Sequence, residues 1–236
     1  MGKYGIKHTF FDEIDTEEKA YFLGLLFADG HNNIKDGVVL IDLQAWDERV
    51  LQKFTNALQP DKPIRYYDNK YSTKGRFRMS IANRYISNRL LELGMVHHKS
   101  EKLSKFNYIP KSLIRHFIRG YFDGNGSIGV FGKVKNVEFS ICSTKEFLEY
   151  IQPMLIENCD LNKVKFGKRH KNRESNSYHL KYTGKLSCQR IREWLYKEST
   201  IYLDRKYDKF YSFWFRLTKI KAQEIKLSWA FIFYSC

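Results

Sequence analysis

The sequence predicts an α+β protein built from two related halves. Two helices with the same spacing of small residues recur roughly a hundred residues apart. Each is followed by segments that alternate apolar and polar residues, and amphipathic helices close each half. The strands lie too close along the chain for crossover helices, so we expect mostly antiparallel pairing. The predicted modules span residues 1–104 and 105–210, with a C-terminal extension over 211–236.

In the first half, the segment Asp15-Thr-Glu-Glu18 is typical of a capping box and predicts a helix that runs to about residue 28. The helix is apolar on every side, which indicates burial all round. Val39, Ile41 and Leu43 occupy alternate positions and predict a half-buried strand. Further strands are expected at about 63–71 and 76–82, and amphipathic helices at about 46–58 and 83–93.

The second half repeats this order. Pro110 precedes a predicted helix near 112–123, in which Arg115 and Arg119 are expected on the solvent side. A half-buried strand follows, with Val137, Phe139 and Ile141 on its inner face. The remaining strands are expected at about 163–168 and 178–183, and the remaining helices at about 144–157 and 185–196.

The composition indicates a partner with negative charge. Lys and Arg number 41 and Asp and Glu number 26, so the net charge is 41 − 26 = +15, which favours nucleic acid. The longest apolar runs are far shorter than the roughly 20 residues that cross a bilayer, and the N-terminus lacks the apolar core of a signal peptide. Four scattered cysteines predict neither a disulfide framework nor a zinc site. We expect a monomer without membrane attachment that is cytoplasmic, nucleoid-associated or in an organellar matrix.

Small residues form a stripe along each repeated helix. Ala20, Gly24 and Ala28 lie at successive fourth positions, and Gly120 and Gly124 continue the same spacing in the second helix. Such stripes let two helix backbones come very close. One stripe alone is more often part of an ordinary core, but its repetition in both halves favours direct packing of the two helices. The residues that follow the stripes, Asp29 and Asn125, would then emerge together at the pseudo-twofold axis.

Two longer segments extend this correspondence. Phe22-Leu-Gly-Leu-Leu-Phe-Ala-Asp-Gly30 aligns with Ile118-Arg-Gly-Tyr-Phe-Asp-Gly-Asn-Gly126, and each half ends in a basic signature that places Lys99 opposite Lys206. Over about residues 15–210, this arrangement resembles a single-chain LAGLIDADG homing endonuclease. We expect a free-standing member rather than one within an intein, because the chain starts with Met1 and lacks a terminal His-Asn pair.

The resemblance implies a pair of αββαββα modules whose sheets form a saddle on duplex DNA. It implies that the two central helices present acidic residues to divalent metal ions, with Mg²⁺ as the cofactor and Ca²⁺ or Mn²⁺ as possible substitutes. The implied metal-site residues are Asp29, Asn125, Ala28 and Gly124. Lys99 and Lys206 match the family's basic residues near the scissile phosphates, where a cation polarises water or stabilises developing charge.

Asn125 departs from the family pattern, which has an acidic residue at this position. An amide oxygen can ligate a hard cation but brings no negative charge, so metal affinity in that half should fall. Asp123 is a poor replacement, because two positions along a helix turn a side chain by about 200°. Three explanations stay open: an engineered inactivation, a natural nicking enzyme, and a DNA-binding relative that does not cut.

Alternation along the strands predicts which side chains would face DNA. If Ile64, Tyr66 and the apolar residues of 76–82 point inward, their neighbours point outward into the major groove. The predicted DNA-contacting residues of the first module are Asp42, Gln44, Arg65, Tyr67, Arg76, Arg78 and Ser80. Those of the second are Lys133, Lys135, Lys163, Lys165, Lys168, Arg169, Lys171, Arg173, His179 and Lys181.

The leading functional hypothesis is a site-specific endonuclease that hydrolyses phosphodiester bonds of duplex DNA. The alternative is a non-cleaving binder with the same scaffold, such as an intron-splicing maturase or a transcription regulator. A basic protein that binds RNA without sequence preference is a third hypothesis, but it leaves the paired helices unexplained. His97 and His98 lack metal-ligand spacing, so we expect them to be surface histidines.

Overall fold

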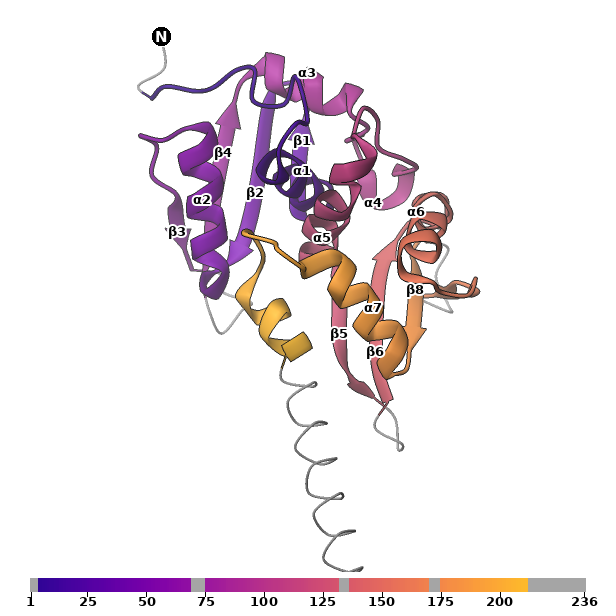
Figure 1. The fold of residues 1–236 in the computed structure, drawn as a ribbon. Coiled ribbons are helices and arrows are strands. Elements are labelled where there is room, and N and C mark those ends of the chain that lie inside the picture. The colour runs from indigo at the N-terminus through magenta and orange to yellow at the C-terminus, as the bar shows by residue number, and fades with distance from the viewer. Residues whose placement is uncertain (1–3, 69–74, 132–135, 170–174, 212–236) are drawn as a thin grey trace, which may run out of the picture.

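The computed structural model describes residues 4–68, 75–131, 136–169 and 175–211, which form two α+β modules (Figure 1). The first module has a central helix, a four-stranded sheet and three further helices. Its elements are α1 (Glu17–Asp29), β1 (Gly30–Asn33), β2 (Val38–Gln44), the 3₁₀ turn η1 (Ala45–Asp47), α2 (Glu48–Leu58), β3 (Arg65–Tyr67), β4 (Arg76–Ala82), α3 (Arg84–Glu92) and α4 (Lys99–Lys102).

The second module repeats the plan, and residues 204–211 are helical at the place that corresponds to α4. Its elements are the 3₁₀ turn η2 (Lys111–Leu113), α5 (Ile114–Asn125), β5 (Gly126–Phe131), β6 (Asn136–Ser143), α6 (Lys145–Cys159), β7 (Gly167–Lys168), β8 (Tyr178–Thr183) and α7 (Lys185–Tyr196). Two helices begin at threonine caps: Thr16 accepts from the Lys19 amide in α1, and Thr144 accepts from the Phe147 amide in α6.

The two sheets have the same topology. The strand orders are β1-β2-β4-β3 and β5-β6-β8-β7, and every pair is antiparallel. The registers also correspond, because Gly30 pairs with Ile41 in the first sheet and Gly126 pairs with Ile141 in the second. The predicted α+β class and the duplication of an antiparallel unit are therefore confirmed.

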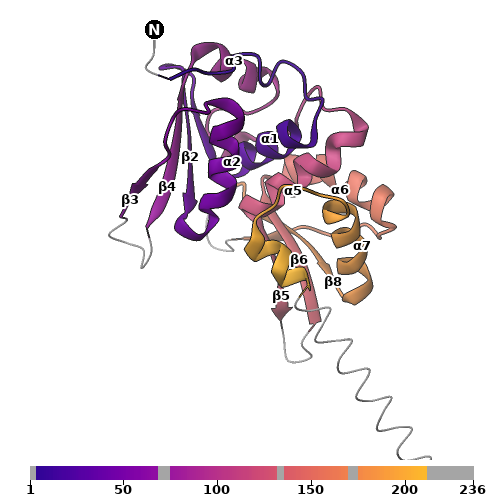
Figure 2. The ribbon, with the colours of Figure 1, turned by 60° about the vertical axis from the view of Figure 1, so that its left-hand side comes forward.

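Each sheet is covered by helices on one face. Helices α2 and α3 contact the first sheet, and α6 and α7 contact the second. Figure 2 shows α2 against the first sheet and α7 against the second. Burial alternates along β2, where Val39, Ile41 and Leu43 are buried and their neighbours are half-buried. The opposite face of each sheet carries the polar side chains. No helix in the described ranges is long and apolar enough to span a bilayer.

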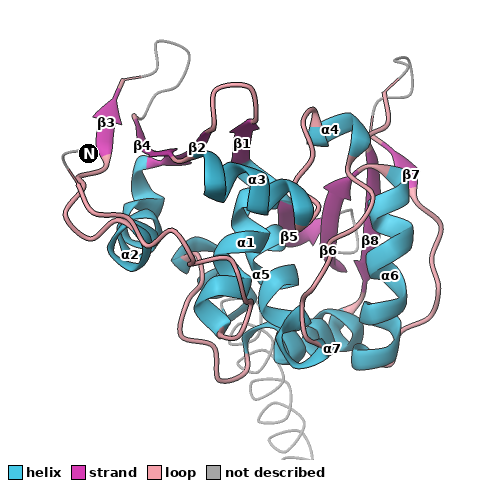
Figure 3. Ribbon diagram, turned by 90° about the horizontal axis from the view of Figure 1, so that it is seen from above, coloured by secondary structure: helices cyan, strands magenta, loops and turns pink. Residues whose placement is uncertain are grey.

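Helices α1 and α5 run in the same direction, pack against each other and lie between the two sheets (Figure 3). A Cβ added at Gly24 would lie 2.0 Å from the Phe117 carbonyl oxygen, and one added at Gly120 would lie 2.1 Å from the Tyr21 carbonyl oxygen. These distances are far below van der Waals contact, so the close approach of the helices requires glycine at both positions. The small-residue stripes therefore face each other.

Two strand predictions need correction. The segment predicted as a strand over 63–71 pairs only at Arg65–Tyr67, and residues 69–74 lie outside the described residues. Of the strand predicted over 163–168, only Gly167–Lys168 pairs with a neighbour. The preceding residues pack against α6 instead, where the Gln152 side chain donates to the Val164 carbonyl over 2.9 Å. The short strands β1 and β5, at the ends of the central helices, had no separate signal in the sequence.

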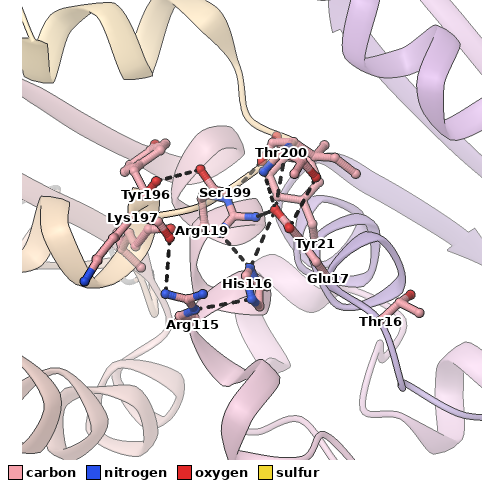
Figure 4. Close-up of polar contacts among 12 residues, drawn as sticks. Thr16, Glu17, Tyr21, Arg115, His116, Arg119, Tyr196, Lys197, Ser199 and Thr200 are labelled. Carbon is pink, nitrogen blue, oxygen red and sulfur yellow. Dashed lines mark hydrogen bonds and ion pairs between the residues drawn. The ribbon is translucent and has the colours of Figure 1, made fainter.

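A buried polar group ties the N-terminal ends of α1 and α5 to the segment after α7 (Figure 4). We call Glu17, His116 and Arg119 the Arg119 cluster. The Arg119 side chain is fully buried, not on the solvent side as predicted, and donates to Glu17 Oε1 over 2.5 Å. It also donates to the Leu195 and Ile201 carbonyls over 2.7 and 2.9 Å. Helix α5 was predicted to be amphipathic, but it buries the charge of Arg119, which is compensated by Glu17.

His116 makes the stability of the fold depend on pH. Its ring nitrogens face guanidinium groups of Arg119 and Arg115 at 2.8 and 3.2 Å. Burial, and next Arg119, lower the pKa of His116 from 6.5 to about 4, against the attraction of Glu17. The unfolded chain therefore binds more protons than the folded chain between these two pKa values, so stability falls as the pH drops from 6.5 towards 4.

We expect the free energy of unfolding to fall by up to about 3 kcal/mol more in the wild type than in His116→Gln over this pH range, since one pKa unit corresponds to about 1.4 kcal/mol. Urea denaturation at a series of pH values measures the difference. Parallel stability curves for the two proteins would show that His116 is not the titrating group.

Candidate functional site

The C-terminal ends of α1 and α5 meet at one junction. Asp29 ends α1 and is exposed, whereas Asn125 ends α5 and is half-buried. A Cβ added at Gly124 would lie 2.4 Å from the Ala28 Cβ and 2.8 Å from Asp29 Oδ2. The carboxylate of Asp29 therefore lies against the last turn of α5, and the structure brings the four predicted metal-site residues together.

Cations surround the Asp29 carboxylate. Desolvation by the surrounding protein raises the pKa of Asp29 above its ordinary value, while the charges of Lys99, Arg205 and Arg76 act in the opposite direction. The three positive groups are suited to stabilise a bound phosphate, whereas the Asp29 carboxylate would face a phosphate only through a cation held between them.

Lys99 and Lys206 occupy corresponding places at the two helix ends. Lys99 Nζ donates to the Phe27 carbonyl over 2.9 Å and also to the Ala28 carbonyl. Lys206 Nζ donates to the Gly126 carbonyl and lies 5.1 Å from the centre of the Phe122 ring. Burial lowers the pKa of both ammonium groups to about 8. Each lysine thus places a partly desolvated positive charge at the negative end of a central helix.

Two further charged residues lie beside the junction and were not among the predicted site residues. Arg205 Nε is 3.0 Å from Asp47 Oδ2, and the Asp47 side chain is buried. Both charges act on the pKa of Asp29. The position of Arg205 next to Lys206 offered a sequence signal, whereas Asp47 in η1 offered none because the junction is assembled from distant segments.

Asp123 points away from the junction. It is buried and accepts hydrogen bonds from the Tyr21 and Tyr196 hydroxyls, both over 2.7 Å, and from the Leu203 amide over 2.8 Å. Tyr21 belongs to α1 and Leu203 precedes Arg205 and Lys206, so this carboxylate fixes the segment that carries the second lysine. Its role in the structure is to position other groups.

The histidines near Lys99 form a surface group. His97 and His98 are exposed, and their ring centroids are 4.0 Å apart. Across the part of the chain that the structure describes, no three or more His, Cys, Asp or Glu residues are grouped so that they could hold a metal ion.

The open face of the first sheet carries a connected polar network. Asp42 accepts from Arg78 Nε and Nη2 over 2.6 and 2.7 Å, and from the Tyr67 hydroxyl over 2.7 Å. Desolvation acts to raise the pKa of Asp42, but the contacts with Arg78 and Tyr67 outweigh it and lower this pKa below its ordinary value. Asp42, which was predicted to contact bases, therefore also binds Arg78 and Tyr67 within the protein and orients their side chains. Arg76 and Gln44 lie opposite each other, and Arg76 Nε and Gln44 Oε1 have no hydrogen-bond partner within the described ranges.

The edge of this face differs from the prediction in two respects. Tyr66 was expected to point inward but is 54% exposed, because β3 is the edge strand of the sheet. The Tyr66 ring contacts the Phe77 ring, with 5.2 Å between the ring centroids. Lys62, which the pattern did not indicate, donates to the Ser80 carbonyl beside Arg65. Arg65 itself is exposed, as expected for a side chain that faces outward.

The open face of the second sheet brings together fewer of the predicted residues. His179 pairs with Cys142 across the strands, and Lys181 pairs with Ser140. Lys181 Nζ is 2.9 Å from Glu138 Oε1. Arg169 Nη1 is 3.6 Å from the Cys142 sulfur, so this arginine also reaches the open face.

Three predicted lysines of the second sheet lie elsewhere. Lys163 and Lys165 border a groove formed with α6, and Lys168 pairs with Tyr178, which lines the same groove. Lys163 and Lys165 are exposed while Val164 and Phe166 pack against the core, as the alternation predicted. Their segment is not a paired strand and lies beside the covering helix α6, so their contact with DNA stays a prediction. Lys133, Lys135, Lys171 and Arg173 lie outside the described residues.

Part of the chain matches a known protein family. Residues 112–195, which include α5 and the second sheet, match the LAGLIDADG-like domain family. No curated protein matches the chain in sequence.

Solved structures resemble both modules together. The homing endonuclease I-GzeII in complex with its DNA target matches with a TM-score of 0.55 and 11% identity, over 87% of this chain and 91% of that chain. The chain has the LAGLIDADG fold. The structure of I-SmaMI, bound to an uncleaved DNA target in the presence of calcium ions, matches with a TM-score of 0.51 and 11% identity, over 88% of this chain and 92% of that chain.

The same LAGLIDADG fold occurs in full-length DUF199/WhiA from Thermatoga maritima. That structure matches with a TM-score of 0.52 and 15% identity, over 93% of this chain and 71% of that chain. The fold is thus shared by homing endonucleases and by WhiA, and the residues at the helix junction must decide between their functions.

The donor atoms at the junction are suited to a hard divalent cation. Asp29 contributes a carboxylate, Asn125 an amide oxygen, and Ala28 and Gly124 backbone carbonyls, of which that of Ala28 accepts from Lys99. Mg²⁺ in phosphate-handling sites is commonly held by one or two carboxylates together with phosphate oxygens. The donor set of this chain fits a cation shared with a phosphate rather than one enclosed by protein ligands.

Proposed function

We propose that this protein is a site-specific DNA endonuclease of the homing type, with Asp29 as the acidic residue of its active site. The observation that carries the proposal is the position of the Asp29 carboxylate. It lies where α1 meets α5, beside two partly desolvated lysines and next to the open faces of two sheets. This is the arrangement that a nuclease needs around a phosphate.

Hydrolysis of a phosphodiester requires that the negative charge of the phosphate be neutralised, that a water molecule be activated as nucleophile, and that the leaving oxygen be stabilised. Mg²⁺ supplies a Lewis acid for these purposes when it is bound, and Ca²⁺ or Mn²⁺ are candidate substitutes. Asp29 would hold it, with oxygens of Ala28, Gly124 and Asn125 nearby. Lys99 and Lys206, which keep a proton at neutral pH, would offer positive charge to the phosphates.

The open sheet faces are the proposed contacts to duplex DNA. In the first sheet, Arg76, Arg78 and Arg65 would bind phosphates or the edges of guanine, and Gln44 would contact bases. In the second sheet, Lys181, His179 and Arg169 occupy the corresponding face. Because one chain carries both modules, we propose that a monomer spans the target.

Asn125 makes the two halves of the site unequal. The proposed consequence is that one strand is cut much faster than the other, so the protein acts as a nicking enzyme or an impaired nuclease. The same residue favours a second candidate function, a LAGLIDADG-fold protein that binds nucleic acid without cutting it. Sharing of the fold with WhiA supports that candidate.

Cleavage of a randomised duplex library with Mg²⁺ tests the proposal. We expect strand-specific cutting that slows at least about a hundredfold in Asp29→Asn, because the carboxylate charge is lost while the shape stays the same. Asp160→Asn is the matched control, since Asp160 is exposed at the end of α6. Undiminished cutting by Asp29→Asn would reject the assigned site.

Asn125→Asp separates the two candidate functions. Restoring the second carboxylate is expected to add cleavage of the slower strand, so that nicks become double-strand breaks. If neither protein cuts while both bind a selected duplex tightly, the binding function holds and the nuclease assignment fails.

A further inference from the structure

A cavity of about 160 Å³ opens beside Asn125. It lies between the ends of the central helices and the second sheet, and its lining includes Lys99, Asn125, Cys142, Arg169 and Ser177. A single water molecule needs only about 10–15 Å³ by the same measure. The cavity therefore has room for a phosphate group together with waters.

Both charged side chains that line this cavity are cationic. They are Lys99 and Arg169, and the lining contains no carboxylate. Arg169 forms no ion pair within the described ranges, and its side chain approaches the Cys142 sulfur at 3.6 Å. Its backbone amide donates to the Ser177 carbonyl over 2.9 Å, which fixes the residue at the rim.

The matching place in the first module is acidic. The registers Gly30 to Ile41 and Gly126 to Ile141 make Asp42 correspond to Cys142, just as Asp29 corresponds to Asn125. In the first sheet, the Asp42 carboxylate neutralises Arg78. In the second module both acidic positions hold neutral residues, so Arg169 has no carboxylate partner within the described ranges, while Asp29 at the helix junction acts on Lys99.

The neutral side chains in the cavity can donate hydrogen bonds. The Tyr121 hydroxyl donates to Ser143 Oγ over 2.7 Å, so the hydroxyl hydrogen of Ser143 is available to a ligand. Lys99 has three N–H donors, and backbone carbonyls accept from it at the end of α1. A site rich in donors and positive charge selects an anion with several acceptor oxygens.

We propose that this cavity is a phosphate-binding pocket that holds one backbone phosphodiester of duplex DNA directly, without a metal ion. Lys99 and Arg169 supply the charge. The pocket anchors the strand that the Asn125 half does not cut and leaves metal-dependent chemistry to the Asp29 half. This inference rests on the proposed binding of DNA, but it does not require that cleavage occur.

Duplex binding in EDTA tests the pocket apart from any cleavage. The probes are short duplexes enriched by binding from a randomised library. Arg169→Ala is expected to weaken binding about fivefold and to reduce the slope of log affinity against log salt by about 1, as for one lost phosphate contact. Arg190→Ala is the matched control, because Arg190 lies on α7, which covers the other face of the second sheet, and pairs with Asp160. Equal losses in the two variants would overturn the proposal.

Asn125→Asp provides an independent test. A carboxylate in the cavity should repel a phosphate, so we expect weaker binding in EDTA and recovery when Ca²⁺ is added. Unchanged affinity in EDTA would contradict a metal-free phosphate pocket.

Alkylation of Cys142 identifies the source of the phosphate. The enriched duplex should slow the alkylation, whereas inorganic phosphate at the same phosphate concentration should not. Protection by inorganic phosphate alone would overturn the assignment to the DNA backbone. If Asp29→Asn cuts as fast as the wild type, the assigned nuclease site is rejected, but the binding measurements above still test the phosphate pocket.

Discussion

Gly120→Val is expected to destabilise the protein by at least about 4 kcal/mol, which is a large part of the stability of an ordinary domain. The added Cβ would lie 2.1 Å from the carbonyl oxygen of Tyr21 and 2.9 Å from the amide nitrogen of Leu25. Both are backbone atoms, so the clash cannot be relieved by a side-chain rotation. The helices would have to separate, and the buried face between the two modules would open.

Urea denaturation followed by circular dichroism measures this loss. Gly167→Val is the control, because a Cβ at Gly167 would have no neighbour within 4 Å. Gly120→Ala serves if the valine variant does not fold, since the same Cβ is present without the methyl groups. A stability of Gly120→Ala equal to the wild type would show that α1 and α5 do not pack as described.

Arg119→Met is expected to cost about 3–5 kcal/mol, the usual loss when one partner of a buried ion pair is removed. The arginine is fully buried and holds Glu17 of α1 together with backbone carbonyls of Leu195 and Ile201. Methionine fills much of the volume but leaves these acceptors without their donor. The segment that leads to Arg205 and Lys206 would also lose its attachment to α5.

An exposed ion pair provides the comparison. Arg49 and Asp204 lie 2.5 Å apart with side chains 56% and 51% exposed, so Arg49→Met should cost less than about 1 kcal/mol. Thermal denaturation of both variants at pH 7 measures the contrast. Equal losses in the two variants would show that the Arg119 cluster is not structural.

The sequence by itself determined the duplicated plan of the protein. Burial alternates with period two along β2, and small residues recur at every fourth position where the central helices touch, so both patterns appear as local spacing. The strands at 76–82 and 178–183 and the helix at 185–196 match the predicted limits. Basic character was also visible, because net charge is a sum over residues and does not depend on the fold.

Only the tertiary structure decided which charges act and which are paired. Asp42 was predicted from its place on the strand, but only the structure shows that it holds Arg78 and Tyr67 in place. Arg119 was predicted on the solvent side, but it is buried among partners from α1, from α7 and from the segment after α7. Lys163 and Lys165 belong to a segment that packs beside α6 and does not pair as a strand, because tertiary packing outweighs a short alternating pattern. Hydrogen bonds between residues distant in the chain determine these outcomes, and local spacing carries no record of such partners.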